Sequence, residues 1–151
     1  MKHVVNIKHL KDQETCRTVV LPLDSSEFSK HALEWSKKHL LCEKDKVILV
    51  NIRSVSETVK ESITGDKDSD QQQQLMECYC SDLKDYSVEY FVGVGDLKSD
   101  LCEFIDTLKG DLVVVGQQDE SMSKTLWGSV STYLAKHSKD SILIVKKRDH
   151  K

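Results

Sequence analysis

Two glycine-containing stretches have the spacing of a phosphate-binding arrangement. The apolar run at residues 113–115 ends at Gly116, and Gly128 and Ser129 follow about twelve residues later. Such a run is typical of a buried parallel strand, and the glycine marks a sharp turn at its end. A hydroxyl residue after Gly128 is typical of a helix N-terminus, where unpaired backbone N–H groups can bind an anion. The spacing therefore indicates a candidate anion site, with ordinary turn glycines as the alternative.

Composition and charge argue against several classes of protein. The 151 residues are enough for one domain with a buried core. A net charge of −3 and a pI near 6.1 give no electrostatic support for binding nucleic acid or an anionic membrane. Uninterrupted apolar runs reach only about five residues, too short to span a bilayer. Five cysteines without zinc-type spacing, and a first segment without a secretory pattern, favour the reducing cytoplasm.

Strand-like and helix-like stretches alternate along the chain. Short apolar or β-branched runs predict strands at residues 17–23, 46–52, 87–94, 112–115 and 141–145. Apolar residues at helical spacing predict helices at about residues 24–41, 75–85, 101–108 and 128–137, the third of which is stopped by Gly110. This alternation predicts an α/β fold, with one doubly wound parallel sheet and helices on both of its faces.

The remaining residues lie in polar segments. We expect residues 1–15 to form an extension that frays or adds a short edge strand, before a domain at 16–148 and a tail at 149–151. Residues 54–74 contain little apolar surface, so we expect a flexible loop that leads into the second helix. The glutamine tract at residues 71–74 is interpreted as part of this solvated loop, with partner binding as the alternative.

Asp24 and Gly116 are expected to lie at the same edge of the sheet. Asp24 follows the first predicted strand, and Gly116 ends the fourth. Parallel α/β sheets bind ligands beyond the carboxyl ends of their strands, where the winding direction reverses. If the first strand lies beside both the second and the fourth, that crevice lies between these two residues. Asp24 then has two interpretations, a ligand contact or an ordinary helix cap.

Residues 17–147 resemble the universal stress protein family. The likeness is carried by VVLPLDSSEFSKHALEWSKK, by KVILVNI, and by DLVVVG followed by LWGSVSTYLAKHSKDSILIVKK. The resemblance implies a five-stranded sheet in the order 3-2-1-4-5 and, in many members, a homodimer formed through the fifth strand. Here that strand contains Ile142, Leu143, Ile144 and Val145. One branch of the family binds ATP or AMP, whereas another lacks the phosphate loop and does not.

The resemblance also implies roles for individual residues. Asp24 corresponds to the aspartate that contacts adenosine, and Ile52 to the strand end whose backbone contacts adenine. Gly116 matches the first glycine of the phosphate loop, and Gly128 with Ser129 matches its close. The complete set of candidate nucleotide-binding residues is Pro22, Asp24, Ile52, Gly116, Gln117, Asp119, Gly128, Ser129 and Val130. For the apolar side chains in this set, core packing is the alternative interpretation.

The phosphate loop departs from the family pattern at Asp119. This residue stands where a second glycine belongs, and only eight residues, 120–127, precede Gly128. A carboxylate about 6 Å from a phosphate charge, at an effective dielectric near 20, repels it by roughly 3 kcal/mol. A Mg²⁺ ion that bridges Asp119 and the phosphate would reverse the sign of this interaction. AMP binding is therefore expected to depend less on this loop than ATP binding does.

The leading hypothesis from the sequence is a cytoplasmic, homodimeric module that binds an adenine nucleotide and regulates a stress response. One alternative is a nucleotide-free member that acts through dimerisation and protein contacts. Another is an electron-transfer or transferase enzyme of the same winding, but no nucleophile is paired with a base. Cys78 and Cys80 do not form a metal pair, because helical residues two apart point to different sides.

Overall fold

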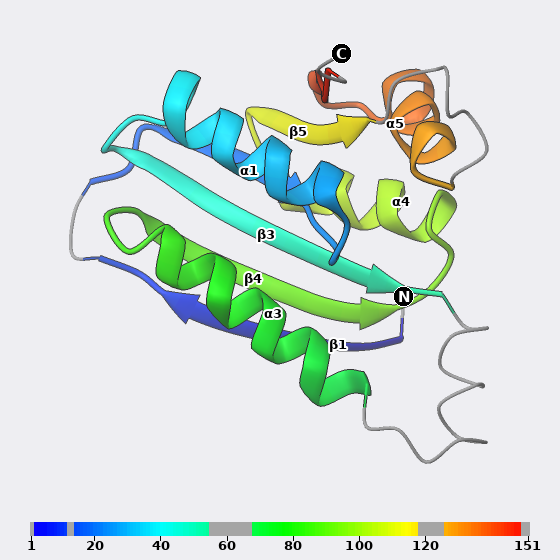
Figure 1. Cartoon of the computed structure of the whole chain (residues 1–151), viewed down its shortest axis with the longest axis horizontal. Helices are drawn as coiled ribbons and strands as arrows, with labels where there is room; N and C mark the ends of the chain where they lie inside the picture. The colour runs from blue at the N-terminus through cyan, green and yellow to red at the C-terminus, as the bar shows by residue number, and fades with distance from the viewer. Residues whose placement is uncertain (1, 12–13, 55–67, 118–125, 149–151) are drawn as a thin grey trace.

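The computed structural model describes residues 2–11, 14–54, 68–117 and 126–148, which form a six-stranded sheet with helices on both faces (Figure 1). In chain order the elements are β1 (Lys2–His9), β2 (Arg17–Pro22), α1 (Glu27–His39), β3 (Asp45–Arg53), α3 (Asp68–Asp82), β4 (Ser87–Val94), α4 (Ser99–Leu108), β5 (Leu112–Gln117), α5 (Leu126–His137) and β6 (Ile142–Lys146). Among these elements, no helix combines the length and apolar character needed to cross a membrane.

The five predicted strands pair in the expected order. The sheet runs β1-β4-β3-β2-β5-β6, so its last five members reproduce the order 3-2-1-4-5, and all four pairings among them are parallel. The predicted strand count is wrong by one, because β1 adds an antiparallel edge strand beside β4. Val5 pairs with Val92 and Ile7 with Tyr90, so alternate apolar residues of a polar segment extend the sheet.

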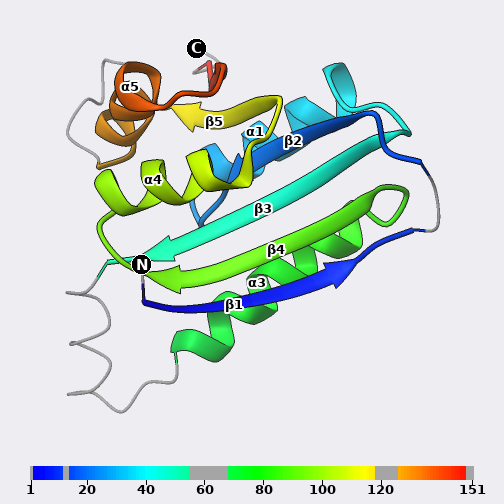
Figure 2. The same ribbon diagram turned by 180° about the vertical axis from the view of Figure 1, so that it is seen from behind.

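The helices form two layers that bury two separate cores. Figure 1 shows α1 and α3 on one face of the sheet, and Figure 2 shows α4 and α5 on the other. The first core cluster includes Leu33 of α1 and Met76 of α3. The second includes Ile105 of α4 and Leu134 of α5. Successive residues of the inner strands point alternately into these two clusters, which explains why those strands are continuously apolar.

The second predicted helix begins earlier than expected. Helix α3 starts at Asp68 and contains the whole glutamine tract, so the interpretation of residues 71–74 as a solvated loop is wrong. Glutamine is a good helix former, and Gln72 is half-buried against the sheet. Leu75 and Met76 then anchor the helix on the first core cluster. Residues 55–67 of the predicted loop lie outside the described residues.

Helix α4 ends without the predicted glycine cap. Its last residue is Leu108, and the left-handed conformation falls on Lys109, which has φ 51°, rather than on Gly110. A Cβ atom at Gly110 would lie 2.7 Å from Cγ2 of Val20. Glycine is therefore needed at this position for close packing against β2, and not for a special backbone angle.

Candidate functional site

The direction of winding reverses between β2 and β5, which are parallel neighbours at the centre of the sheet. The chain leaves β2 towards α1 on one face, and it reaches α5 on the opposite face after β5 (Figures 1 and 2). The carboxyl ends of these strands, Pro22 and Gln117, therefore lie at one edge of the sheet. This is the type of location at which parallel α/β sheets bind ligands.

Asp24 braces the turn between β2 and α1. Its Oδ1 atom accepts hydrogen bonds from the Ser26 backbone N–H and from the Ser29 hydroxyl, each at 2.8 Å. The N-cap of α1 is Ser26, whose Oγ accepts from the Ser29 N–H at 3.3 Å, so Asp24 is not the cap residue itself. No described residue donates a hydrogen bond to Oδ2 of Asp24, and this half-buried oxygen is the acceptor that a ligand could use.

Two residues that the sequence reasoning missed hold the backbone around Asp24. The Tyr79 hydroxyl on α3 donates to the Asp24 carbonyl oxygen at 2.7 Å. The Asn51 side-chain amide on β3 donates to the Leu23 carbonyl oxygen at 3.0 Å. Burial and, second to it, the negative charge of Asp24 together raise the pKa of Tyr79 to about 12, so the hydroxyl keeps its proton. The available signal for Asn51 was one amide residue inside an otherwise apolar strand.

Three of the predicted apolar contacts are core residues. Pro22 is buried and pairs with Val50 of β3. The side chains of Ile52 and Val130 belong to the second core cluster, and Val130 has no exposed surface. A ligand at the carboxyl ends of the strands can therefore meet these residues only through their backbone atoms.

Gly116 is required by packing. A Cβ atom at this position would collide with the Phe28 carbonyl group of α1 and would lie 3.4 Å from the Cβ atom of Ala32. The absence of a side chain therefore allows α1 to lie directly on β5. The next residue, Gln117, is half-buried, and its carbonyl accepts a hydrogen bond from the Lys147 backbone N–H at 3.4 Å.

The backbone of Gly128 and Ser129 lies in the first turn of α5. The helix begins at Leu126, two residues before the predicted start. The first four N–H groups of a helix have no partner within it, and those of Gly128 and Ser129 are the third and fourth of α5. Asp119 and the remainder of the predicted phosphate loop lie outside the described residues.

An ion pair links the residue that follows β6 to the first turn of α1, at the carboxyl ends of the strands. Lys147 Nζ lies 2.8 Å from Oε2 of Glu27, which is in the first turn of α1. The hydrogen bond and charge of Lys147 lower the pKa of Glu27. Sequence reasoning did not single out either residue. In the part of the chain that the structure describes, no three histidine, cysteine or acidic side chains are grouped as metal ligands.

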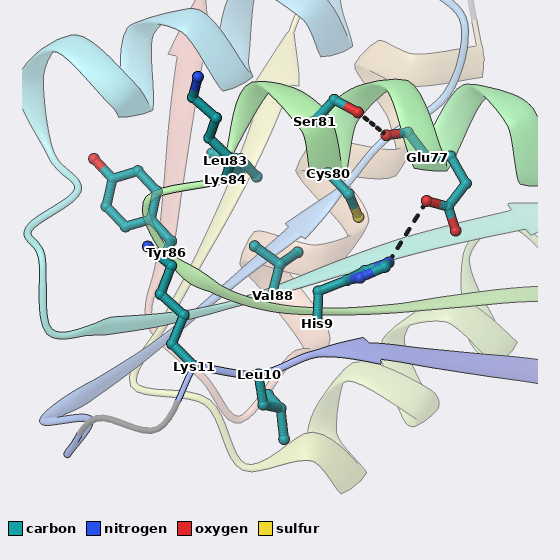
Figure 3. Close-up of a pocket in the computed structure, with 10 residues that line it drawn as sticks. All are labelled: His9, Leu10, Lys11, Glu77, Cys80, Ser81, Leu83, Lys84, Tyr86 and Val88. Atoms are coloured by element: carbon teal, nitrogen blue, oxygen red, sulfur yellow. Dashed lines mark hydrogen bonds and ion pairs between the residues drawn. The ribbon is translucent and has the colours of Figure 1, made fainter.

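A separate hollow of about 460 Å³ lies between α3 and the end of β1 (Figure 3). His9 and Lys11 line one side of it, and Glu77, 3.5 Å from His9, lines the other. Burial raises the pKa of Cys80 in its wall to about 12, so this thiol is a poor nucleophile. Among the residues that the structure describes, no predicted nucleotide-binding residue lines this hollow.

Comparisons with known proteins agree with the observed topology. The family model described as "Universal stress protein family" matches residues 15–146. A search of curated protein sequences finds no significant match. The solved structure of the hypothetical protein MJ0577 superposes with a TM-score of 0.71 at 22% identity, covering 89% of this chain and 98% of that one.

Two further solved structures are universal stress proteins with a bound nucleotide. One is an Arabidopsis thaliana protein with AMP bound, with a TM-score of 0.65 at 18% identity, covering 88% of this chain and 93% of that one. The other is a complex with cAMP, with a TM-score of 0.60 at 22% identity, covering 85% and 95% of the two chains. At these identities the likeness shows the fold. The family model spans nearly the whole chain, and the sheet has the strand order 3-2-1-4-5 with one added edge strand. The protein therefore belongs to the universal stress protein family.

Proposed function

We propose that this protein binds an adenine nucleotide, AMP or ATP, and acts as a regulatory module in a stress response. The supporting observation is the pairing of two groups at one edge of the sheet. Asp24, which follows β2, has a carboxylate oxygen to which no described residue donates a hydrogen bond. The first turn of α5, which follows β5, has backbone amides. Family membership and the nucleotides bound to two similar proteins support the same assignment.

Each part of the nucleotide has a proposed contact. Oδ2 of Asp24 accepts a hydrogen bond from the ribose hydroxyls, and the backbone at Ile52 meets the adenine edge. The amides of Gly128 and Ser129 bind phosphate, which suits the partial positive charge of a helix N-terminus. Between these contacts, the ligand meets the backbone at the carboxyl ends of β2 and β5, which is that of Pro22, Gly116 and Gln117. This division assigns the nucleoside to the β2 side of the crevice and the phosphates to the β5 side.

Asp119 makes ATP binding dependent on Mg²⁺. The repulsion of roughly 3 kcal/mol estimated for a nearby carboxylate corresponds to a more than hundredfold loss of affinity. A divalent cation between Asp119 and the phosphates removes this repulsion, because each side then faces a positive charge. AMP has a shorter phosphate chain, and we expect its affinity to depend on Mg²⁺ much less. Asp119→Gly should raise ATP affinity at least about tenfold in the absence of Mg²⁺.

The proposed function is tested by two measurements on the purified full chain. Mass spectrometry after denaturation should find AMP or ATP released from the protein. Isothermal titration calorimetry should then detect binding of AMP with or without Mg²⁺, and stronger binding of ATP with Mg²⁺. If neither nucleotide is retained or bound, the proposal is wrong, and the nucleotide-free alternative, in which the fold acts through protein contacts, replaces it.

We also propose a homodimer formed through β6, in the cytoplasm. Strand β6 is the last strand of the sheet, and its residues Ile142, Leu143 and Ile144 are only half-buried, whereas Val145 is buried. An apolar edge strand of this kind favours pairing with another chain. The odd number of cysteines supports a reducing compartment. Light scattering at tens of micromolar should give the mass of a dimer, and a monomer would contradict the proposed interface.

A further inference from the structure

Helix α3 is linked to the turn that carries Asp24 directly through Tyr79 and indirectly through Asn51 of β3. Tyr79 donates its hydroxyl to the Asp24 carbonyl at 2.7 Å. Gln72 acts through Asn51, whose Nδ2 atom donates both to Oε1 of Gln72 at 3.1 Å and to the Leu23 carbonyl at 3.0 Å. The carbonyl groups of Leu23 and Asp24 therefore both accept hydrogen bonds from buried side chains. Tyr79 is 4% exposed and Asn51 is 1% exposed.

The two contacts come from one face of α3. Gln72 and Tyr79 are seven residues apart, which is close to two turns of an α-helix, so their side chains point in the same direction. The helix is also fixed to the sheet between these points by Met76, which is fully buried. A rigid element with two attachments thus defines where the backbone of residue 24 lies.

The orientation of Asn51 is determined by its partners. A backbone carbonyl can only accept, so the Leu23 oxygen must face the amide nitrogen of Asn51 and not its oxygen. Oδ1 of Asn51 is then buried with no hydrogen-bond partner among the described residues. A buried unpaired acceptor costs folding free energy. A valine at this position would avoid that cost, but it would also release the Leu23 carbonyl.

We propose that Tyr79 and Asn51 are positioning residues, which fix the backbone of Asp24 so that its carboxylate meets the ribose hydroxyls of the nucleotide. This inference rests on the proposed nucleotide-binding function and names the residues that prepare that site. A hydrogen bond weakens steeply when the donor and acceptor are no longer well aligned. Release of the Asp24 carbonyl therefore weakens binding even though neither Tyr79 nor Asn51 touches the ligand.

Tyr90 provides a matched control for Tyr79. It is also buried, and its hydroxyl also donates within the α3 layer, to Oε1 of Glu77 at 2.9 Å. Glu77 lies on the part of α3 that faces His9 of β1, and this hydrogen bond does not involve the Leu23–Asp24 turn. Phenylalanine at either position keeps the ring and removes one buried hydroxyl, so both variants should lose stability.

The first test is calorimetric titration of AMP into wild type, Tyr79→Phe and Tyr90→Phe. Loss of one positioning hydrogen bond should weaken AMP binding by Tyr79→Phe roughly fivefold to tenfold. Tyr90→Phe should bind AMP within about twofold of wild type, although urea unfolding should show that it also loses stability. Equal affinities for the two variants would overturn the inference, because a merely structural role predicts equal effects.

The second test requires no nucleotide and separates this inference from the proposed function. Hydrogen exchange should be measured at the Ser26 amide, which donates to Oδ1 of Asp24, in the ligand-free protein. Tyr79→Phe should accelerate its exchange, and Tyr90→Phe should leave it unchanged. If wild type binds no nucleotide, the proposed function fails while this result still decides whether Tyr79 holds the turn. Unchanged exchange in Tyr79→Phe would overturn the positioning role, whatever the affinity for AMP.

Discussion

Gly116→Ala separates the two roles that this glycine could have. In the sequence the residue resembles the first glycine of a phosphate loop, whereas in the structure it lies beneath α1. The added methyl group would collide with the Phe28 carbonyl group and would lie 3.4 Å from Cβ of Ala32. Because the first of these neighbours is helix backbone, α1 must move as a unit to relieve the collision.

The expected loss of stability follows from two opposing effects. Overpacking of a well-packed site typically costs about 1–3 kcal/mol. Replacement of glycine by alanine also reduces the entropy of the unfolded chain, which stabilises the folded state by about 0.4–1 kcal/mol. The net expectation is a destabilisation of about 1–2 kcal/mol. Because the collision is with backbone, Ala32→Gly in the same chain should not restore the lost stability.

Urea unfolding followed by tryptophan fluorescence measures this loss, and calorimetry with AMP measures binding by the folded variant. Gly110→Ala is the matched control, since its new Cβ atom would lie 2.7 Å from Cγ2 of Val20, away from the candidate site. We expect both variants to be destabilised. Unchanged stability of Gly116→Ala together with weakened nucleotide binding would refute the packing explanation and favour direct contact with the ligand.

Three further predictions concern titratable groups. Burial would raise the pKa of Asp45, but the hydrogen bonds from Arg17, the hydrogen bond from the Cys42 backbone N–H and the charge of Arg17 together lower it. The stabilisation is therefore present above pH 3.8 and is lost as pH falls further. Asp45→Asn should cost about 2 kcal/mol at pH 7, less than in a fully buried pair because Arg17 is 35% exposed, and it should cost less at pH 2. Equal urea-unfolding losses at both pH values would contradict this. Burial and, second to it, the charge of Asp106 raise the pKa of Asp140, so the stability that its neutral form contributes is complete below pH 3.8 and is lost as pH rises. Asp140→Asn should therefore stabilise the protein by about 1 kcal/mol at pH 7. A lower melting temperature of this variant at pH 7 would refute the prediction. The pKa of Tyr79 is raised from 10.0 to about 12. Between these two pH values, the free energy of unfolding of wild type should therefore fall by about 1.4 kcal/mol more per pH unit than that of Tyr79→Phe. Equal losses of stability with pH in the two proteins would count against this prediction.

Local patterns were sufficient to predict the central part of the fold. The run that became β2 is β-branched and apolar because its residues enter both core clusters, and such a run is visible without knowledge of its neighbours. Strand β1 was less visible, since five of its eight residues are polar or charged. Its place in the sheet depends on partners far along the chain, such as Glu89, which accepts a hydrogen bond from Asn6 at 3.0 Å.

The candidate site was predictable in outline but not in its supporting contacts. Asp24 and the end of β5 were expected at one edge because parallel strands share the edge at which their carboxyl ends lie, and because the family resemblance implied the strand order. The contacts of Tyr79 and Asn51 with the Leu23–Asp24 turn join residues 55 and 28 positions apart, and no local spacing indicates such a pair. The role of Gly116 also could not be distinguished, because close packing and ligand approach both require the absence of a side chain.

Titration of AMP into wild type and Asp24→Ala tests the central claim most directly. Ser36→Ala is the control, because it removes a buried hydroxyl of α1 that donates to the Ala32 carbonyl and makes no contact with Asp24. The account predicts that AMP binds wild type and Ser36→Ala with similar affinity and binds Asp24→Ala at least about tenfold more weakly. Equal affinity of AMP for wild type and Asp24→Ala would contradict it.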